Sequence, residues 1–207
     1  MSKEGKTGVS ANTPKRIMFG AGTIHKGLKY SGNKWNFDES IVGATSGGSK
    51  LTIMPEITNV DVDGALVKAK GLNVKTGEAA SMEVNFIELT PDVIKAATIG
   101  TDGTSEDTAN YDVIQPKAAI AEGDYWENIA FVGKTLDGKD IIVIMDNALC
   151  TSGFEQEGKN KEGSVGKYTF ECHAELTSDL DTLPWKIYFP KSASTQSASK
   201  SNTAAVS

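Results

Sequence analysis

The chain has 207 residues, of which 39% are hydrophobic and 23% are charged, a balance typical of a soluble globular protein and not of a disordered one. This length predicts a single domain with enough apolar residues to build a core without disulfides or metals. The formal net charge of −6 repels a DNA backbone, so we expect any contact with nucleic acid to be non-adhesive.

The two ends of the chain have the composition of flexible segments. Residues 1–14 are polar and rich in Gly, Ser and Lys, which predicts a flexible N-terminal arm. Residues 191–207 are low-complexity Ser, Ala and Thr, which predicts a disordered tail. Residues 15–190 would form one β domain. We find neither the apolar core of a secretory signal near the start nor an apolar stretch long enough to cross a membrane.

The segment "GATSGGSK", residues 43–50, has the glycine spacing of a phosphate-binding loop. Such a loop reads G-x-x-x-x-G-K-[ST] and lies between a buried strand and a helix. Here Ser49 precedes Lys50, so the lysine and the hydroxyl are in the reverse order. The following residues include Pro55 and many β-branched side chains, which do not favour a helix. We therefore interpret residues 43–50 as a mobile glycine-rich loop and not as a nucleotide site.

The stretch "NVDVDGALVKAK" predicts a hairpin that folds about a type I′ turn at Asp63-Gly64. One face of this hairpin would join the core, and the other would be polar, with Leu66 as an apolar exception. The expected pairs are Val62–Ala65, Val60–Val67 and Thr58–Ala69, and the polar face would hold Asn59, Asp61, Lys68 and Lys70.

The stretch "AASMEVNFIEL" alternates between apolar and polar residues, as a half-buried strand does. Its inward side chains would be Ala80, Met82, Val84 and Phe86, and its outward side chains would be Ser81, Glu83 and Asn85.

One helix is expected, in "TPDVIKAATIG". Thr90 suits the N-cap, Pro91 the first helical position, and Asp92 the positive end of the helix dipole. Val93, Ile94 and Ala97 would form its apolar stripe, and Gly100 would end it. Residues 101–123 would then form a long polar connection.

A second hairpin, "NIAFVGKTLDGKDIIVIM", would fold about Asp137-Gly138 and is apolar on both faces. We expect core on one side and the helix or another subunit on the other. The expected pairs are Val132–Val143, Ala130–Met145 and Phe131–Ile144.

Two further strands complete a β-sandwich or small barrel with one packed helix. The inward side chains of "KYTFECHAEL" would be Tyr168, Phe170, Cys172, Ala174 and Leu176, and those of "PWKIYF" would be Trp185, Ile187 and Phe189.

The sequence offers no catalytic, metal or cofactor site. It has no G-x-S-x-G elbow, and His25 lies in a glycine-rich segment where we expect a turn residue and not a base. Asp61 and Asp63 have the spacing of paired carboxylates, but Asp63 enters a turn, which explains it without catalysis. Cys150 and Cys172 could pair, although we expect reduced core residues.

Several segments follow one another in a recognisable order. They are an early "FGAG", the Gly/Ser-rich loop, a strand pair ending in "DVDG", the element "AKGLNVKTGE", and "ASMEVNF" running into "ELTPDVIKAA". This order resembles that of the tail tube, or major tail, proteins of long-tailed bacteriophages. The resemblance covers about residues 15–190 and depends on the order, because no single piece is a catalytic motif.

The resemblance implies a β-sandwich or barrel with a flanking helix, assembled into hexameric rings that stack into a hollow tube for DNA ejection. It implies a virion protein that is assembled in the host cytoplasm, is not an enzyme, and uses neither a cofactor nor a membrane. Its partners would be further copies of itself and the tape measure, terminator and baseplate proteins. Genomic DNA would pass through without specific binding.

The resemblance also suggests site residues. In this family a long loop in the first half reaches the next ring, and residues 31–50 fit by position. The candidates for this inter-ring loop are Gly43, Ser46, Gly47, Gly48, Ser49 and Lys50; those for the lumen are Glu83 and Asn85, or Asn59 and Asp61; and those for an inter-subunit hairpin are Phe131, Ile142 and Ile144.

Other interpretations remain open at this point. The inner tube of a contractile phage tail or of a tail-like bacteriocin shares the tube fold. A monomeric β-sandwich binding module would show exposed aromatic residues, whereas only 7% of residues are aromatic, and Trp35, Trp126 and Trp185 are scattered along the chain. An enzyme is the least favoured class.

Overall fold

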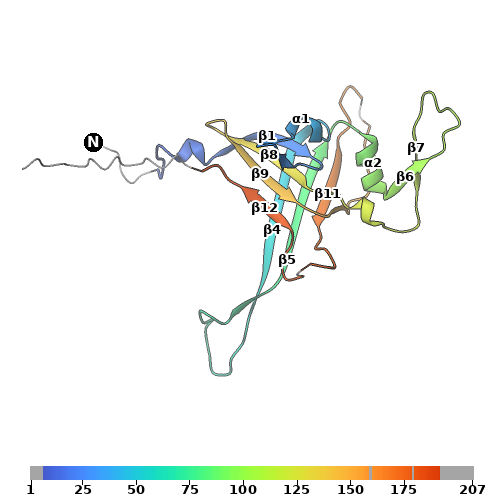
Figure 1. Ribbon diagram of the computed structural model, residues 1–207. Helices are drawn as coiled ribbons and strands as arrows, with labels where there is room; N and C mark the ends of the chain where they lie inside the picture. The colour runs from blue at the N-terminus through green and yellow to red at the C-terminus, as the bar shows by residue number, and fades with distance from the viewer. Residues whose placement is uncertain (1–6, 159, 179, 192–207) are drawn as a thin grey trace, which may run out of the picture.

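Two four-stranded antiparallel sheets form the body of the protein in the computed structural model, which describes residues 7–158, 160–178 and 180–191 (Figure 1). The first sheet has the order β1 (Met18–His25), β8 (Ile129–Thr135), β9 (Asp140–Met145), β12 (Trp185–Tyr188). The second has the order β10 (Ala148–Cys150), β11 (Gly166–Cys172), β5 (Asn73–Phe86), β4 (Thr45–Asn59). The shorter elements are η1 (Thr13–Lys15), β2 (Tyr30–Ser31), β3 (Lys34–Trp35), α1 (Phe37–Ser40), α2 (Pro91–Thr98), β6 (Gly100–Gly103), β7 (Val113–Pro116) and η2 (Glu122–Asp124). The chain is mainly β, as the sequence predicts.

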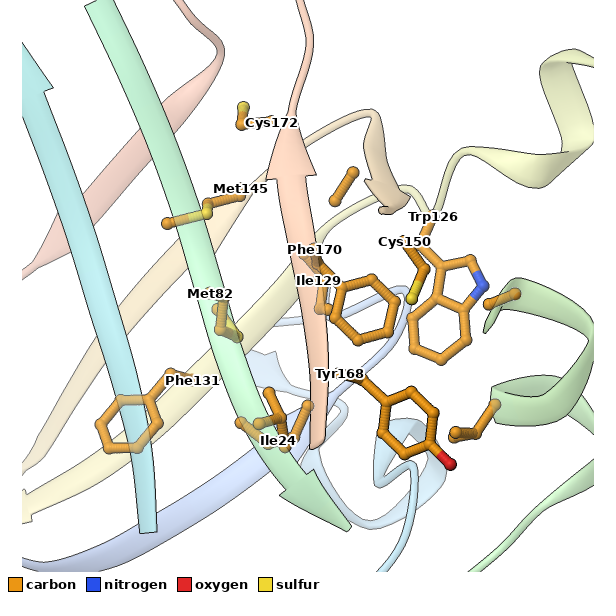
Figure 2. Packing of buried hydrophobic residues seen from close by; sticks show 14 of the residues in the cluster. Ile24, Met82, Trp126, Ile129, Phe131, Met145, Cys150, Tyr168, Phe170 and Cys172 are labelled. Atoms are coloured by element: carbon orange, nitrogen blue, oxygen red, sulfur yellow. The ribbon is translucent and has the colours of Figure 1, made fainter. Parts of the chain in front are cut away.

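The main core lies between the two sheets and is built by alternation along β5 and β11. Met82 is paired with Phe170 and Val84 with Tyr168, and all four are fully buried. Figure 2 shows side chains from both strands in one cluster with Ile129 of β8. Each such side chain contributes about 1.5–3 kcal/mol on burial, so this cluster is the main force that holds the sheets together. The predicted inward sides of β5 and of residues 168–172 are confirmed.

The β8–β9 hairpin is buried on both faces, but its second cover comes from the same chain. Phe131 belongs to the main core, whereas Ile142 and Ile144 pack under Leu28 and the half-buried Trp35 in a second cluster. This cover consists of residues 28–40, which include β2, β3 and α1. The three candidates for an inter-subunit hairpin are therefore interior residues, and the expectation that another subunit covers them is wrong.

The register of this hairpin also differs by one residue from the prediction. Val132 pairs with Ile142 and Ala130 with Ile144. The reason is a three-residue connection: Thr135 N donates to Lys139 O at 2.8 Å, with Gly138 in the left-handed region at φ +81°. A two-residue turn at Asp137-Gly138 would instead have given the predicted pairs.

The predicted hairpin about Asp63-Gly64 is replaced by a much longer one. β4 and β5 pair from Thr45↔Phe86 to Asn59↔Asn73, so residues 60–72 are the loop at its tip and not strands. A turn is present, with Ala65 N donating to Val62 O at 3.0 Å. Only Gly64 has a positive φ there, at the third position of the turn, which is the pattern of type II and not of type I′.

The helix begins as predicted and ends differently. Thr90 Oγ1 accepts a hydrogen bond from Val93 N at 3.4 Å, and Pro91 opens the helix. The end is set by Ile99, whose φ of +50° places it in the left-handed region, while Gly100 already belongs to β6. The buried residues of α2 are Val93, Ala96 and Ala97. The expected polar connection after the helix contains the β6–β7 hairpin.

The ends of two strands differ from expectation. β11 ends at Cys172, so Leu176 is not inward but 91% exposed. β12 leaves Ile187 and Phe189 half-exposed, while Trp185 packs against the core. Of the predicted N-terminal arm, residues 1–6 lie outside the described residues and Thr13 begins η1; of the predicted C-terminal tail, residues 192–207 also lie outside them.

His25 is a buried strand residue and not the expected turn residue. It ends β1 and is only 1% exposed. Thr23 Oγ1 lies 2.8 Å from its Nε2, and Ser40 Oγ lies 2.9 Å from its Nδ1. Ser40 Oγ donates to Asn36 O at 2.8 Å, so it accepts from a neutral ring protonated at Nδ1. Burial lowers the pKa of His25 below its usual 6.5.

This environment predicts a pH-dependent stability. As the pH falls through about 6.5, the unfolded chain takes up a proton at His25 before the folded chain does, so the free energy of unfolding decreases. Above that pH the ring is neutral in both states and adds no slope. Replacing His25→Gln removes this part of the dependence, at most about 1.4 kcal/mol per pH unit. Urea unfolding of both proteins between about pH 7.5 and 5.5 measures it; equal slopes would contradict the assignment.

Candidate functional site

The outward face of the second sheet carries a charged cluster centred on Glu83. This residue lies on β5 directly opposite Lys50 of β4 and beside β11. Lys50 Nζ lies 2.9 Å from Glu83 Oε1, and Lys167 Nζ lies 2.6 Å from Oε2. Each carboxylate oxygen therefore has its own lysine, and the three side chains join three neighbouring strands.

The cluster changes the acid–base behaviour of Glu83. Hydrogen bonds from Lys167 and, next, from Lys50 lower the pKa of the Glu83 carboxyl to about 2. The Glu83 side chain is 23% exposed, whereas those of Lys50 and Lys167 are 71% and 66% exposed. Because the lysines are in water, the contribution of these pairs to stability is modest, and their main effect is to fix the position of charge.

Asn85, two residues further along β5, holds a bulge in β4. Its Nδ2 donates to Gly48 O at 3.1 Å and to Gly47 O at 3.5 Å. Both glycines have a positive φ, +87° for Gly47 and +81° for Gly48. They lie where the register shifts between Thr45 and Ser49. A residue with a side chain is strained in this conformation, so the glycine pair allows the bulge.

Two sets of predicted residues therefore meet on one surface. The predicted inter-ring loop is not a mobile loop, because β4 begins at Thr45 and its alternation and bulge include Ser46, Gly47, Gly48, Ser49 and Lys50. Of the six candidates, only Gly43 precedes the strand; it lies beside Glu88, whose Oε2 accepts from Ala44 N at 2.8 Å. The structure brings the C-terminal part of this segment against the predicted lumen residues Glu83 and Asn85.

The rest of this face is polar and balanced in charge. Glu171 Oε1 accepts from Thr151 Oγ1 at 2.9 Å. Within residues 49–54, 79–85 and 166–172 the charged residues are two lysines and two glutamates, and all four point outward (Lys50, Lys167, Glu83 and Glu171). This part of the face is therefore mixed in charge and not purely acidic.

β4 and β5 continue beyond the body as a projecting arm, residues 54–79 (Figure 1). A second bulge, where Glu56 pairs with Gly77 but Ile57 with Lys75, lies near its base. The arm carries exposed apolar side chains: Met54, Ile57, Val60, Val62, Leu66, Val67 and Val74. Leu66 is 98% exposed and Val67 79%.

The arm separates the two predicted lumen pairs. Asn59 and Asp61 lie at its tip, whereas Glu83 and Asn85 lie on the face of the body. The arm was not predicted, because one face of the hairpin about Asp63-Gly64 was expected to join the core. The signal was present in Leu66, an apolar residue on a face predicted to be polar.

The other candidate groups form no reactive site. Cys150 and Cys172 are free and buried, as expected, and burial raises the pKa of the Cys172 thiol to about 12. Asp61 and Asp63 lie in water on the tip loop. In the part of the chain that the structure describes, no three His, Cys, Asp or Glu side chains come together as a metal site, and no helix is long and apolar enough to cross a membrane.

Comparison of the sequence with models of protein families gave no match. Comparison with curated proteins gave no match either.

The Glu83 cluster predicts a measurable titration. In the intact protein the Glu83 carboxyl titrates near 2, and Lys167→Gln raises this pKa toward 4.5 by more than Lys50→Gln does, since Lys167 is its stronger partner. Because the pKa of Glu83 is lower in the folded state, its contacts with the two lysines stabilise the fold above about pH 4.5. This contribution is lost as the pH falls toward 2. NMR titration of the carboxyl carbon measures each value. A Glu83 pKa near 4.5 in the unsubstituted protein would contradict the two contacts.

Proposed function

We propose that the protein is a structural subunit that assembles with further copies into stacked hexameric rings, the tail tube of a long-tailed phage, and that the sandwich is a tail-tube fold. The observation that carries the proposal is the arm at residues 54–79. It projects from a body whose apolar strands are covered on both faces, and it holds its own apolar side chains out in water. Such an arm gains stability only by burying its tip against another molecule.

The edges of the sheets support assembly with identical copies. β4 and β10 are the outer strands of the second sheet, and β4 is 15 residues long. A long edge strand presents unpaired backbone groups that invite another strand. In a closed ring of copies the β4 edge of one subunit would be covered by the next subunit. The opposite edge offers little for strand pairing, because β10 has only three residues and its Ala148 already exchanges backbone hydrogen bonds with Trp126 of the same chain.

The arm replaces residues 31–50 as the segment that reaches the next ring. The earlier candidates belong to β2, β3, α1 and the start of β4, which pack on the body. Residues 60–72, in contrast, form the loop at the tip of the arm and are almost all exposed (Figure 1).

The outward face of the second sheet is our proposed lumen surface, with Glu83 and Asn85 on it. Asn59 and Asp61 would instead lie at the contact between rings, because they are on the arm. A face whose lysines are already paired lets DNA pass without specific binding. In this proposal the protein is not an enzyme, belongs to the virion, and meets the tape measure, terminator and baseplate proteins.

A monomeric binding module remains the second candidate, because the structure has exposed aromatic side chains. Phe19 and Tyr111 lie apart on different elements, but the exposed Tyr30 and Tyr188 both pack on the half-buried Trp35, with ring centroids 5.2 and 5.1 Å from it. A sheath lattice around the tubes in micrographs would assign the subunit to a contractile tail or a tail-like bacteriocin.

Substitution at the arm tip tests the proposal. We expect Leu66→Asp to prevent the stacking of rings, because it places a charge where an apolar contact must form. The matched control is Leu176→Asp, which changes an equally exposed leucine outside the arm. Negative-stain microscopy and sedimentation should show assemblies for the unsubstituted protein and the control, and none that stack for Leu66→Asp. Circular dichroism should be the same for all three.

Two outcomes would contradict this assignment. One is assembly of Leu66→Asp indistinguishable from that of the unsubstituted protein. The other is equal loss of assembly in Leu176→Asp, since the effect would then not belong to the arm.

A further inference from the structure

We propose that Glu83 is an internal counter-ion, which occupies Lys50 and Lys167 and so keeps them from gripping the phosphates of DNA that moves past this face. The inference rests on the proposed function, because it concerns the surface that would line the tube. It goes beyond that function by assigning one side chain the task of making the surface non-adhesive.

The first step is the reach of the two lysines. Both ammonium groups lie on the outward face and are mostly exposed, on strands that flank β5 on either side. Unpaired, they would be two flexible cations on one side of the sheet. Lysine in that state binds phosphate as a point charge, and each neutralised phosphate releases counter-ions.

The second step is the position of Glu83 between them. Its two oxygens are taken by different lysines, so one carboxylate restrains both. Glu83 is ionised throughout the neutral range, and the lowering of its pKa reflects the hydrogen bonds from the two lysines. Glu83 is also the least exposed of the three, which suits an anchor toward which the lysines fold back.

The third step is the contrast with Glu171, the other glutamate on this face. Its carboxylate accepts from the Thr151 hydroxyl at 2.9 Å, and no ion pair joins it to a lysine among the described residues. Removing the charge of Glu171 therefore frees no cation, whereas removing that of Glu83 frees two. Both substitutions remove one negative charge from the face, but only that of Glu83 releases lysines. Comparing them therefore distinguishes an effect of released lysines from an effect of net charge.

The consequence grows with assembly. In a tube each subunit would repeat the pair of lysines around the ring and from ring to ring, so every position of the moving DNA would meet them. Free lysines at that density would slow ejection. The shared carboxylate restrains both lysines and leaves the three side chains with a net charge of +1, which Glu171 on the same face balances.

The experiment compares four full-length proteins: unsubstituted, Glu83→Gln, Glu171→Gln and the triple variant Lys50→Gln/Glu83→Gln/Lys167→Gln. Binding of a fluorescein-labelled DNA duplex is followed by anisotropy at neutral pH over a range of salt concentrations. We expect Glu83→Gln to bind about tenfold more tightly at low salt than the unsubstituted protein, with a log–log salt slope steeper by about 1.8. Glu171→Gln and the triple variant should match the unsubstituted protein.

Three results would overturn the inference. They are no gain in Glu83→Gln, an equal gain in Glu171→Gln, and a gain that persists in the triple variant. Circular dichroism of each protein shows whether it is folded. Negative-stain images of the unsubstituted protein decide the proposed function separately: failure to form rings counts against the tube, while the DNA titration still decides whether Glu83 restrains the lysines.

Discussion

The alternation of side chains along β5 is the constraint on which the rest of the structure depends. Met82 and Val84 face the core, whereas the residues that follow each of them, Glu83 and Asn85, face outward. β5 is paired on both sides, by β11 and β4, so its register fixes theirs. A slip by one residue would place the carboxylate in the core and the apolar side chains in water. The same strand continues into the arm, so core, polar face and arm are parts of one hairpin.

The two faces of β5 within the body could be predicted from the sequence, because local signals decide them, whereas its pairing with β4 could not. The period-two pattern of residues 80–86 identifies the buried face without knowledge of any partner, and it also identifies Glu83 and Asn85 as outward. The N-cap at Thr90 is likewise local, since its hydroxyl bonds to a backbone group three residues away. The mainly β character follows from the same patterns.

The rest depends on contacts that a sequence pattern does not carry. The β8–β9 register differs from the predicted one because the connection has three residues and not two, with Gly138 in a left-handed conformation. The second apolar face of that hairpin has a cover from residues 28–40, which are distant in sequence. The arm was hidden because Val62 and Val67 have the apolar character of core residues. The cluster about Glu83 was hidden because residues 43–50 were interpreted as a loop, whereas Lys50 belongs to β4 and pairs with Glu83.

In the proposed assembly, identical subunits close around a channel lined by the outward face of β10–β11–β5–β4. Cryo-electron microscopy of the purified protein at high concentration tests this most directly. We expect hollow rings or tubes in which Glu83 and Asn85 face the axial channel and residues 60–72 contact the adjacent ring. Particles of only 21.9 kDa, or a tube with that face turned away from its channel, would contradict it.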